Sequence, residues 1–226
     1  MINRYIALIP AYDPTPILCD LVRNLCNAGF SIVIVDDGSK DSCSGIFDDC
    51  ISRATVLHHP KSAGKGQALK TGLHYIQENY SSDSVIVTVD ADGQHTIDDA
   101  LNICALAARH KRALILGKRQ FDKSVPLRNR FRNTLTSFMF RRNTGVRLQD
   151  PMTGLRAFAH RMIPTLLAVP GQWHEYEINA LLYLAREKIR ILEQPVKTVY
   201  NDIYSLSQYK LVKEVLSTAP ASSGNH

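Results

Sequence analysis

Short apolar runs alternate with longer segments of mixed polarity along most of this 226-residue chain. The runs are rich in Val, Ile and Leu and end at Pro, Gly or Asp, which is typical of buried strands. Several of the intervening segments carry apolar residues at helical spacing. A regular alternation of strands and helices predicts an α/β fold with a mixed, mostly parallel sheet and helices on both faces.

The runs also predict where each element lies. We expect strands within residues 4–12, 30–39, 54–59, 84–95, 112–119 and 189–200. We expect helices within 16–28, 43–52, 64–80, 97–110, 127–143 and 175–188, with a loop over 145–158. No internal repeat or linker divides the chain, so we expect one domain over 1–212 and a tail over 213–226 with a flexible end.

Composition and the chain start bear on location. The start "MINRYIALIPAY" has only a short apolar run before Pro and Asp, so no signal peptide is expected. No window is apolar enough to predict a transmembrane helix. The five cysteines lack metal-ligand spacing and suit a reducing compartment. The expected location is therefore the cytoplasm.

Polar clusters follow three of the expected strands: Asp36-Asp37, Asp90-Ala91-Asp92 and Lys118-Arg119. The carboxyl ends of parallel strands meet at one edge of a sheet, where ligands bind in folds of this class. We therefore expect the three clusters to converge on one site.

Asp90 and Asp92 are two positions apart, and on a strand they would point to the same side. Two such carboxylates repel unless a cation or strong donors neutralise them, and oxygen ligands favour Mg²⁺ or Mn²⁺. Gln94 and His95 are further ligands or ordinary loop residues. The alternative is that one Asp caps the helix near 97 and the other makes an Asx turn.

Two more motifs bear on the kind of ligand that the site would hold. Gly64-Lys65-Gly66 opens a helix, where free N–H groups favour an anion. Asp36 and Asp37 can accept from a base or a ribose hydroxyl, or they simply mark a turn. The Gly64-Lys65-Gly66 turn is not a Walker sequence. Gly-x-Gly-x-x-Gly is also absent, which argues against a nicotinamide enzyme.

A basic stretch accounts for the net charge of +6. Twelve Lys or Arg and a single acid, Asp122, lie between Arg109 and Arg147. Such a stretch suits anionic lipid, a phosphorylated substrate or nucleic acid, or it is a solvated face. Four apolar residues recur there at helical spacing and would face either an anionic membrane surface or the protein's own core; these are Phe131, Leu135, Phe138 and Met139.

Six motifs in one order are similar to those of family 2 glycosyltransferases. They are "IPAY" (9–12), "VDDGSKD" (35–41), "AGKGQALKTG" (63–72), "VDADGQH" (89–95), "GKR" (117–119) and "DPMTGLRAF" (150–158). The chain resembles the branch that includes dolichol-phosphate mannosyltransferases and bacterial polyprenyl-phosphate glycosyltransferases. The resemblance implies a GT-A fold, which is a Rossmann-like nucleotide-diphospho-sugar transferase fold. It also implies a metal-dependent, inverting transfer from a UDP- or GDP-sugar to a polyprenyl phosphate at the cytoplasmic membrane face.

The resemblance implies roles for individual residues on the donor side. Pro10, Ala11 and Tyr12 would flank the nucleobase, and Asp37, with Asp36 nearby, would bind the nucleoside. Asp90 and Asp92 would hold Mg²⁺ or Mn²⁺ on the donor diphosphate, with help from Gln94. Asp92 is counted among the catalytic residues for this reason. Lys65 and Arg119 would contact the nucleotide sugar, Arg119 through a phosphate.

On the acceptor side, Asp150 would be the candidate catalytic base, and Arg156 would support its loop, which also holds Thr153. Glu175 or Glu177 would contact the acceptor, although first-turn acids of a helix explain them almost as well. Lys210 would replace the basic residue that this branch often has near Gln208. Ser62 departs from the usual Asn, and many relatives continue into membrane helices.

Two other functions remain open at this point. The same donor site would serve a sugar hydroxyl in polysaccharide or glycolipid synthesis, and Asp150 would then take the proton. A non-catalytic nucleotide-sugar or nucleic-acid binder would use the basic stretch instead. The sequence shows no pattern of aromatic residues interleaved for base stacking, which argues against nucleic acid.

Overall fold

The structure is a computed structural model that describes residues 4–119 and 127–197, with only the backbone described over 127–132. The predicted tail over 213–226, Gln208 and Lys210 lie outside the described residues.

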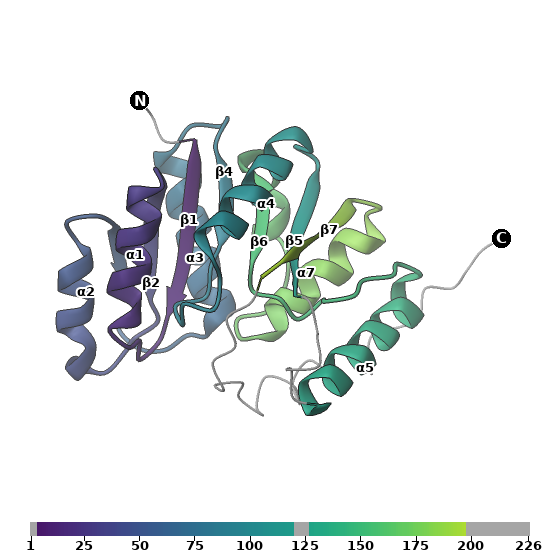
Figure 1. Cartoon of the computed structure of the whole chain (residues 1–226), viewed down its shortest axis with the longest axis horizontal. Coiled ribbons are helices and arrows are strands. Elements are labelled where there is room, and N and C mark those ends of the chain that lie inside the picture. The colour runs from purple at the N-terminus through teal and green to yellow at the C-terminus, as the bar shows by residue number, and fades with distance from the viewer. Residues whose placement is uncertain (1–3, 120–126, 198–226) are drawn as a thin grey trace.

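A seven-stranded sheet forms the centre of the molecule, in the order β3-β2-β1-β4-β6-β5-β7 (Figure 1). All neighbouring strands are parallel except for β6, which is antiparallel to both β4 and β5. The strands are β1 (Tyr5–Ala11), β2 (Ser31–Asp36), β3 (Thr55–His58), β4 (Val85–Thr88), β5 (Ala113–Arg119), β6 (Arg156–Ala159) and β7 (Arg190–Val196). The predicted mixed, mostly parallel sheet is confirmed.

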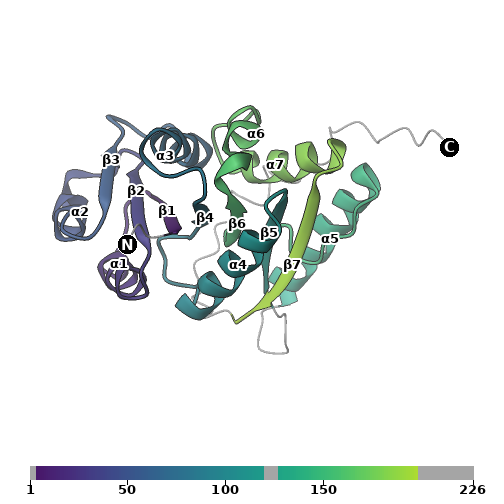
Figure 2. The same ribbon diagram turned by 90° about the horizontal axis from the view of Figure 1, so that it is seen from above.

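Helices cover both faces of the sheet, as predicted (Figure 2). The helices are α1 (Ile17–Asn27), α2 (Ser44–Cys50), α3 (Lys65–Asn79), α4 (Ile97–Arg109), α5 (Leu127–Thr144), α6 (Ile163–Leu167) and α7 (Glu175–Arg186). Helices α1, α2 and α4 pack on one face, and α3, α6 and α7 pack on the other. Two 3₁₀ turns, Asp41–Cys43 and His160–Met162, precede α2 and α6.

The largest departure from the sequence prediction lies in the expected loop over 145–158. Its last residues begin β6, which joins β4 to β5 and completes the sheet. The prediction was wrong because four residues between two antiparallel partners need no period-2 pattern, since both faces of the strand are buried. Strand β4 is also shorter than expected and ends at Thr88, so Asp90 and Asp92 lie in the following turn rather than on the strand.

Helix α5 buries a face different from the predicted apolar stripe. Asn133, Thr136, Phe140 and Asn143 are buried, whereas Phe138 is 61% exposed. Met139 packs against the core, so the stripe divides between core and surface. The side chain of Phe131 lies outside the described residues. Over the described part of the chain, no helix combines the length and the apolar character that crossing a membrane would require.

Candidate active site

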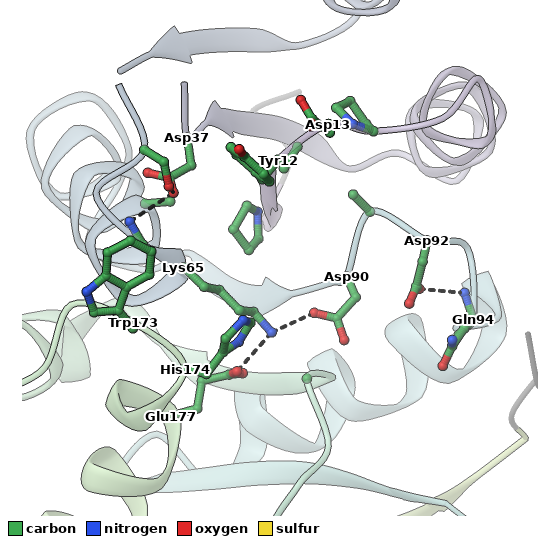
Figure 3. A pocket seen from close by; sticks show the side chains of 18 of the residues that line it. Tyr12, Asp13, Asp37, Lys65, Asp90, Asp92, Gln94, Trp173, His174 and Glu177 are labelled. Carbon is green, nitrogen blue, oxygen red and sulfur yellow. Dashed lines mark hydrogen bonds and ion pairs between the residues drawn. The ribbon is translucent and has the colours of Figure 1, made fainter. Parts of the chain in front are cut away.

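A cavity of about 680 Å³ opens where the parallel strands reach their carboxyl ends (Figure 3). The cavity is lined by residues of the segments that follow β1, β2, β3 and β4, of the loop before β6 and of the start of α7. Ten of the predicted site residues line it: Pro10, Ala11, Tyr12, Asp37, Lys65, Asp90, Asp92, Gln94, Arg156 and Glu177. Five others do not line it: Asp36, Arg119, Asp150, Thr153 and Glu175.

The Asp37 carboxylate has all its acceptor positions occupied. One oxygen accepts from Ala63 N at 2.9 Å and lies 2.8 Å from His59 Nδ1. The other accepts from Ser62 Oγ at 2.7 Å and from Gly64 N at 2.9 Å. Burial acts against the charge, but these hydrogen bonds hold the pKa of Asp37 below its ordinary value. A carboxylate offers about four acceptor positions, so a nucleoside contact here would have to displace a present partner.

Asp36 turns away from the cavity and fixes its own loop. It accepts from Ser39 N at 2.8 Å and pairs with His58 Nδ1 at 2.9 Å. Asp36 and His58 are register partners on the parallel strands β2 and β3, so neighbouring Asp-Asp and His-His pairs meet side by side. Sequence reasoning did not single out the two histidines. A His-His pair at the end of the neighbouring strand was the available signal.

Lys65 lines the cavity and lies between two carboxylates (Figure 3). Its Nζ is 2.8 Å from Asp90 Oδ1 and 2.8 Å from Glu177 Oε2. Burial opposes the ammonium charge, yet Asp90 and Glu177 raise the pKa of Lys65 above its ordinary value. Burial likewise opposes the Asp90 charge, and Lys65 holds the pKa of Asp90 well below its ordinary value. Both groups are therefore charged at neutral pH.

Glycines allow the close approaches around this ion pair. Gly64, the residue before α3, has φ +98°, and a Cβ there would collide with the Trp173 ring. Gly154 lies against Asp90, and a Cβ there would collide with the Asp90 carboxylate. Trp173 is 50% exposed and lines the cavity, although sequence reasoning gave it no role.

Asp92 makes the Asx turn of the structural alternative to metal binding, by accepting from Gln94 N at 3.1 Å. The other part of that alternative, an Asp that caps the helix, is not found, because Thr96 caps α4 and accepts from Asp99 N. Burial and the negative charge of Asp90 raise the pKa of Asp92. Two carboxylates that disfavour each other's charge are thus adjacent at the cavity.

These oxygen donors fit a hard divalent cation. Across residues 4–119 and 127–197, no group of three His, Cys, Asp or Glu side chains is arranged to hold a metal by itself. An ion on Asp90 and Asp92, with Gln94 nearby, would take its remaining ligands from water or phosphate, which is how Mg²⁺ is usually bound. Within the described part of the chain, the buried His95 ring has no hydrogen-bond partner, and its Nε2 is 3.7 Å from Asp90 Oδ2, beyond hydrogen-bond distance.

Asp150 and Arg119 are paired behind the cavity wall. Asp150 is 0% exposed and Arg119 is 5% exposed. Arg119 donates to the carboxylate from Nε at 2.7 Å, from Nη2 at 2.8 Å and from its backbone N at 3.1 Å. The backbone N of Asp150 donates in turn to Glu193 Oε1 at 2.8 Å. The structure therefore brings together the expected base and the expected phosphate ligand, but as partners of each other.

Arg156 ties the loop before β6 to helix α7. It donates to the carbonyls of Thr153 at 2.9 Å, Pro151 at 3.3 Å and Glu177 at 2.7 Å. Thr153 is fully buried in that loop. Glu175 accepts from the backbone N of Gln172 and of Trp173, so it holds the turn that opens α7.

Comparison of the sequence with known proteins identifies the family of the chain. The model of glycosyl transferase family 2 matches residues 6–164. The chain is 29% identical over 222 residues to the UDP-N-acetylglucosamine–dolichyl-phosphate N-acetylglucosaminyltransferase of Methanococcus voltae, covering 89% of this chain and 87% of that protein. It is 27% identical to the undecaprenyl-phosphate 4-deoxy-4-formamido-L-arabinose transferase of Pseudomonas savastanoi, covering 71% of this chain and 49% of that protein.

Solved structures show the same fold. One is the mannosyltransferase PcManGT of Pyrobaculum calidifontis in complex with GDP-Man and Mn²⁺, with a TM-score of 0.66 and 16% sequence identity. The match covers 97% of this chain and 63% of the PcManGT chain. Another is glucosyl-3-phosphoglycerate synthase of Mycobacterium tuberculosis, with a TM-score of 0.69 and 17% sequence identity. The match covers 95% of this chain and 79% of the synthase chain. These likenesses confirm the predicted GT-A fold. With the family match over most of the chain, they lead to one conclusion: the chain is a glycosyltransferase and belongs to glycosyl transferase family 2.

Proposed function

We propose that the chain transfers a sugar from a nucleotide-diphosphate sugar to a polyprenyl phosphate, with inversion at the sugar carbon and with a divalent metal ion. The observation that carries this proposal is that Lys65, Asp90 and Asp92 line one cavity, with Lys65 in contact with Asp90. The leaving diphosphate gains negative charge as the glycosidic bond breaks. Preorganised positive charge beside it stabilises that transition state without any proton transfer.

The metal site consists of Asp90 and Asp92, with Gln94 at its edge. A bound Mg²⁺ or Mn²⁺ would act as a Lewis acid toward the diphosphate. The chain's own contribution is to fix the two carboxylates in one turn and to bring Lys65 to the same place. Among possible donors, a UDP-sugar is favoured by the Methanococcus voltae relative, whose name specifies UDP-N-acetylglucosamine.

The buried Asp150 supports a phosphate acceptor over a sugar hydroxyl. A hydroxyl nucleophile needs a base, whereas a phosphate oxygen is already anionic. Asp150 does not line the cavity, and its carboxylate is committed to Arg119. The named substrates of both curated relatives, a dolichyl and an undecaprenyl phosphate, agree with this choice. In this proposal Asp150 and Arg119 position the cavity wall.

We further propose that the protein works as a peripheral protein on the inner face of the cell membrane. Exposed Phe138 lies on α5 with the exposed Arg141 and Arg142 near the end of the same helix. An apolar side chain among arginines suits the boundary of an anionic lipid surface, where each nearby basic residue adds about 1 kcal/mol.

The test is a transfer assay with radiolabelled UDP-sugars and undecaprenyl or dolichyl phosphate in detergent micelles, with Mn²⁺ or with EDTA. Label should enter the lipid fraction only when metal is present. Asp92→Asn should abolish transfer, whereas Asp98→Asn, an exposed Asp in the first turn of α4, should retain it. No label in the lipid fraction with any of the UDP-sugars in the presence of Mn²⁺ would count against the lipid-phosphate acceptor, and near-normal transfer by Asp92→Asn would contradict the metal assignment.

A further inference from the structure

Lys65 occupies the position at Asp90 where a cation is needed. Its ammonium contacts Asp90 Oδ1 at 2.8 Å while it also contacts Glu177 Oε2 at 2.8 Å. The Lys65 side chain is 18% exposed, whereas that of Asp90 is 31% exposed. Asp90 is therefore still open to the cavity on one side, although its Oδ1 already contacts the positively charged ammonium of Lys65.

A divalent ion on Asp90 and the ammonium of Lys65 would repel each other across one carboxylate. The repulsion is strong where water is partly excluded. Glu177 offers the ammonium a second carboxylate at the same distance, so Lys65 can release Asp90 without losing its ion pair. The remaining contact with Glu177 leaves the ammonium beside the cavity.

We propose that Lys65 is an internal counter-ion that competes with the metal ion for Asp90, and that Glu177 is the positioning residue that retains the Lys65 ammonium when the metal binds. The inference rests on the proposed function, because it takes Asp90 as a metal ligand. It adds that metal alone binds weakly, and that metal and the nucleotide diphosphate strengthen each other's binding. The diphosphate provides the negative charge that lets both cations remain together. Such mutual strengthening is reciprocal by linkage.

The test measures Mn²⁺ binding by the loss of the free-ion EPR signal, first without nucleotide and then with UDP. Lys65→Met should bind Mn²⁺ about ten-fold more tightly than the natural protein without nucleotide, since a repelling charge is removed. Lys65→Arg keeps the charge and should show no gain. Lys111→Met, an exposed lysine before β5, is the matched control and should leave affinity unchanged.

UDP should then strengthen Mn²⁺ binding less in Lys65→Met than in the natural protein. Glu177→Gln should bind Mn²⁺ alone more weakly, because Asp90 becomes the one carboxylate left to Lys65 in the described triad. If Lys65→Met does not fold by circular dichroism, Lys65→Gln replaces it, since its amide can still donate to both carboxylates.

Unchanged or weaker Mn²⁺ binding in the neutral Lys65 variant would overturn the proposal. Adding Asp90→Asn to Lys65→Met should remove the gain, and a gain that survives would also overturn it, because the metal would then lie elsewhere. These readouts need no sugar transfer. A gain in Mn²⁺ affinity in Lys65→Met, with no transfer to lipid by the natural protein, would uphold the counter-ion and reject the proposed function. Transfer to lipid with no gain in Mn²⁺ affinity would uphold the proposed function and reject the counter-ion.

Discussion

The buried ion pair between Arg119 and Asp150 yields the sharpest prediction about stability. Arg119→Met would leave the fully buried Asp150 carboxylate with one of its three described donors, the Arg119 backbone N at 3.1 Å. Removing one partner of a buried pair leaves an uncompensated charge and costs about 3–5 kcal/mol. We expect a loss of that size in the free energy of unfolding, measured by urea titration with far-UV circular dichroism.

Two control variants separate the ion pair from general damage. Arg112→Met removes an exposed arginine just before β5 and should change the free energy of unfolding by no more than about 0.5 kcal/mol. The double variant Arg119→Met with Asp150→Leu removes both charges, and it should be more stable than Arg119→Met alone, because apolar pairs often replace buried ion pairs at little cost. A loss below about 1 kcal/mol in Arg119→Met, or a double variant no better than that single one, would refute this reasoning.

The same pair decides whether Asp150 acts as a base. With a phosphate acceptor, Asp150→Asn should lose transfer activity in step with lost stability, and lowering the temperature or adding a stabilising osmolyte should recover part of it. Loss of kcat in a fully folded Asp150→Asn variant would instead support proton removal from a hydroxyl acceptor.

Three further predictions concern the cavity. Asp92→Asn should raise metal-free stability at pH 7 by roughly 1 kcal/mol, because it removes a charge that burial and the neighbouring Asp90 disfavour, the two causes that raise the pKa of Asp92. A native pKa above the unfolded value makes the stability of the natural protein fall as pH rises through that window, so the gain should vanish below about pH 4. A gain that is the same at about pH 3 would contradict this prediction. Gly154→Ala should displace the Asp90 carboxylate, which a Cβ at this position would meet, and so weaken Mn²⁺ binding measured by EPR. Unaltered Mn²⁺ binding would show that the Asp90 side chain can move aside without losing the metal. Asp37→Ala should cost at least about 3 kcal/mol in urea unfolding, since four hydrogen-bonding groups lose a charged partner, and a small loss would mean that the turn holds without it.

Part of the site was predictable because it depends on local sequence and on one rule of topology. Apolar runs placed the strands, and three polar clusters after them were expected at one edge. Asp37, Asp90 and Asp92 of the first two clusters line one cavity, whereas Arg119 of the third does not. The short antiparallel β6 was not predictable, since four buried residues carry no distinctive period. Helix α5 was predicted, but its buried face was not, because buried polar side chains such as Asn133 depend on partners elsewhere, here the Gln149 carbonyl.

Local sequence patterns were sufficient to predict the class of fold, the edge of the sheet that carries the chemistry and the motifs of family 2. These features follow from strand periodicity, from turn residues and from the fact that parallel strands end at the same edge. Which charges face the cavity and which neutralise each other behind it depends instead on the packing of distant segments. Asp150 meets Arg119, and Lys65 meets Glu177, through strand order and the docking of α7 against α3. Burial makes such pairing obligatory, because a charge removed from water must find a partner, and the partner is supplied by a distant part of the chain.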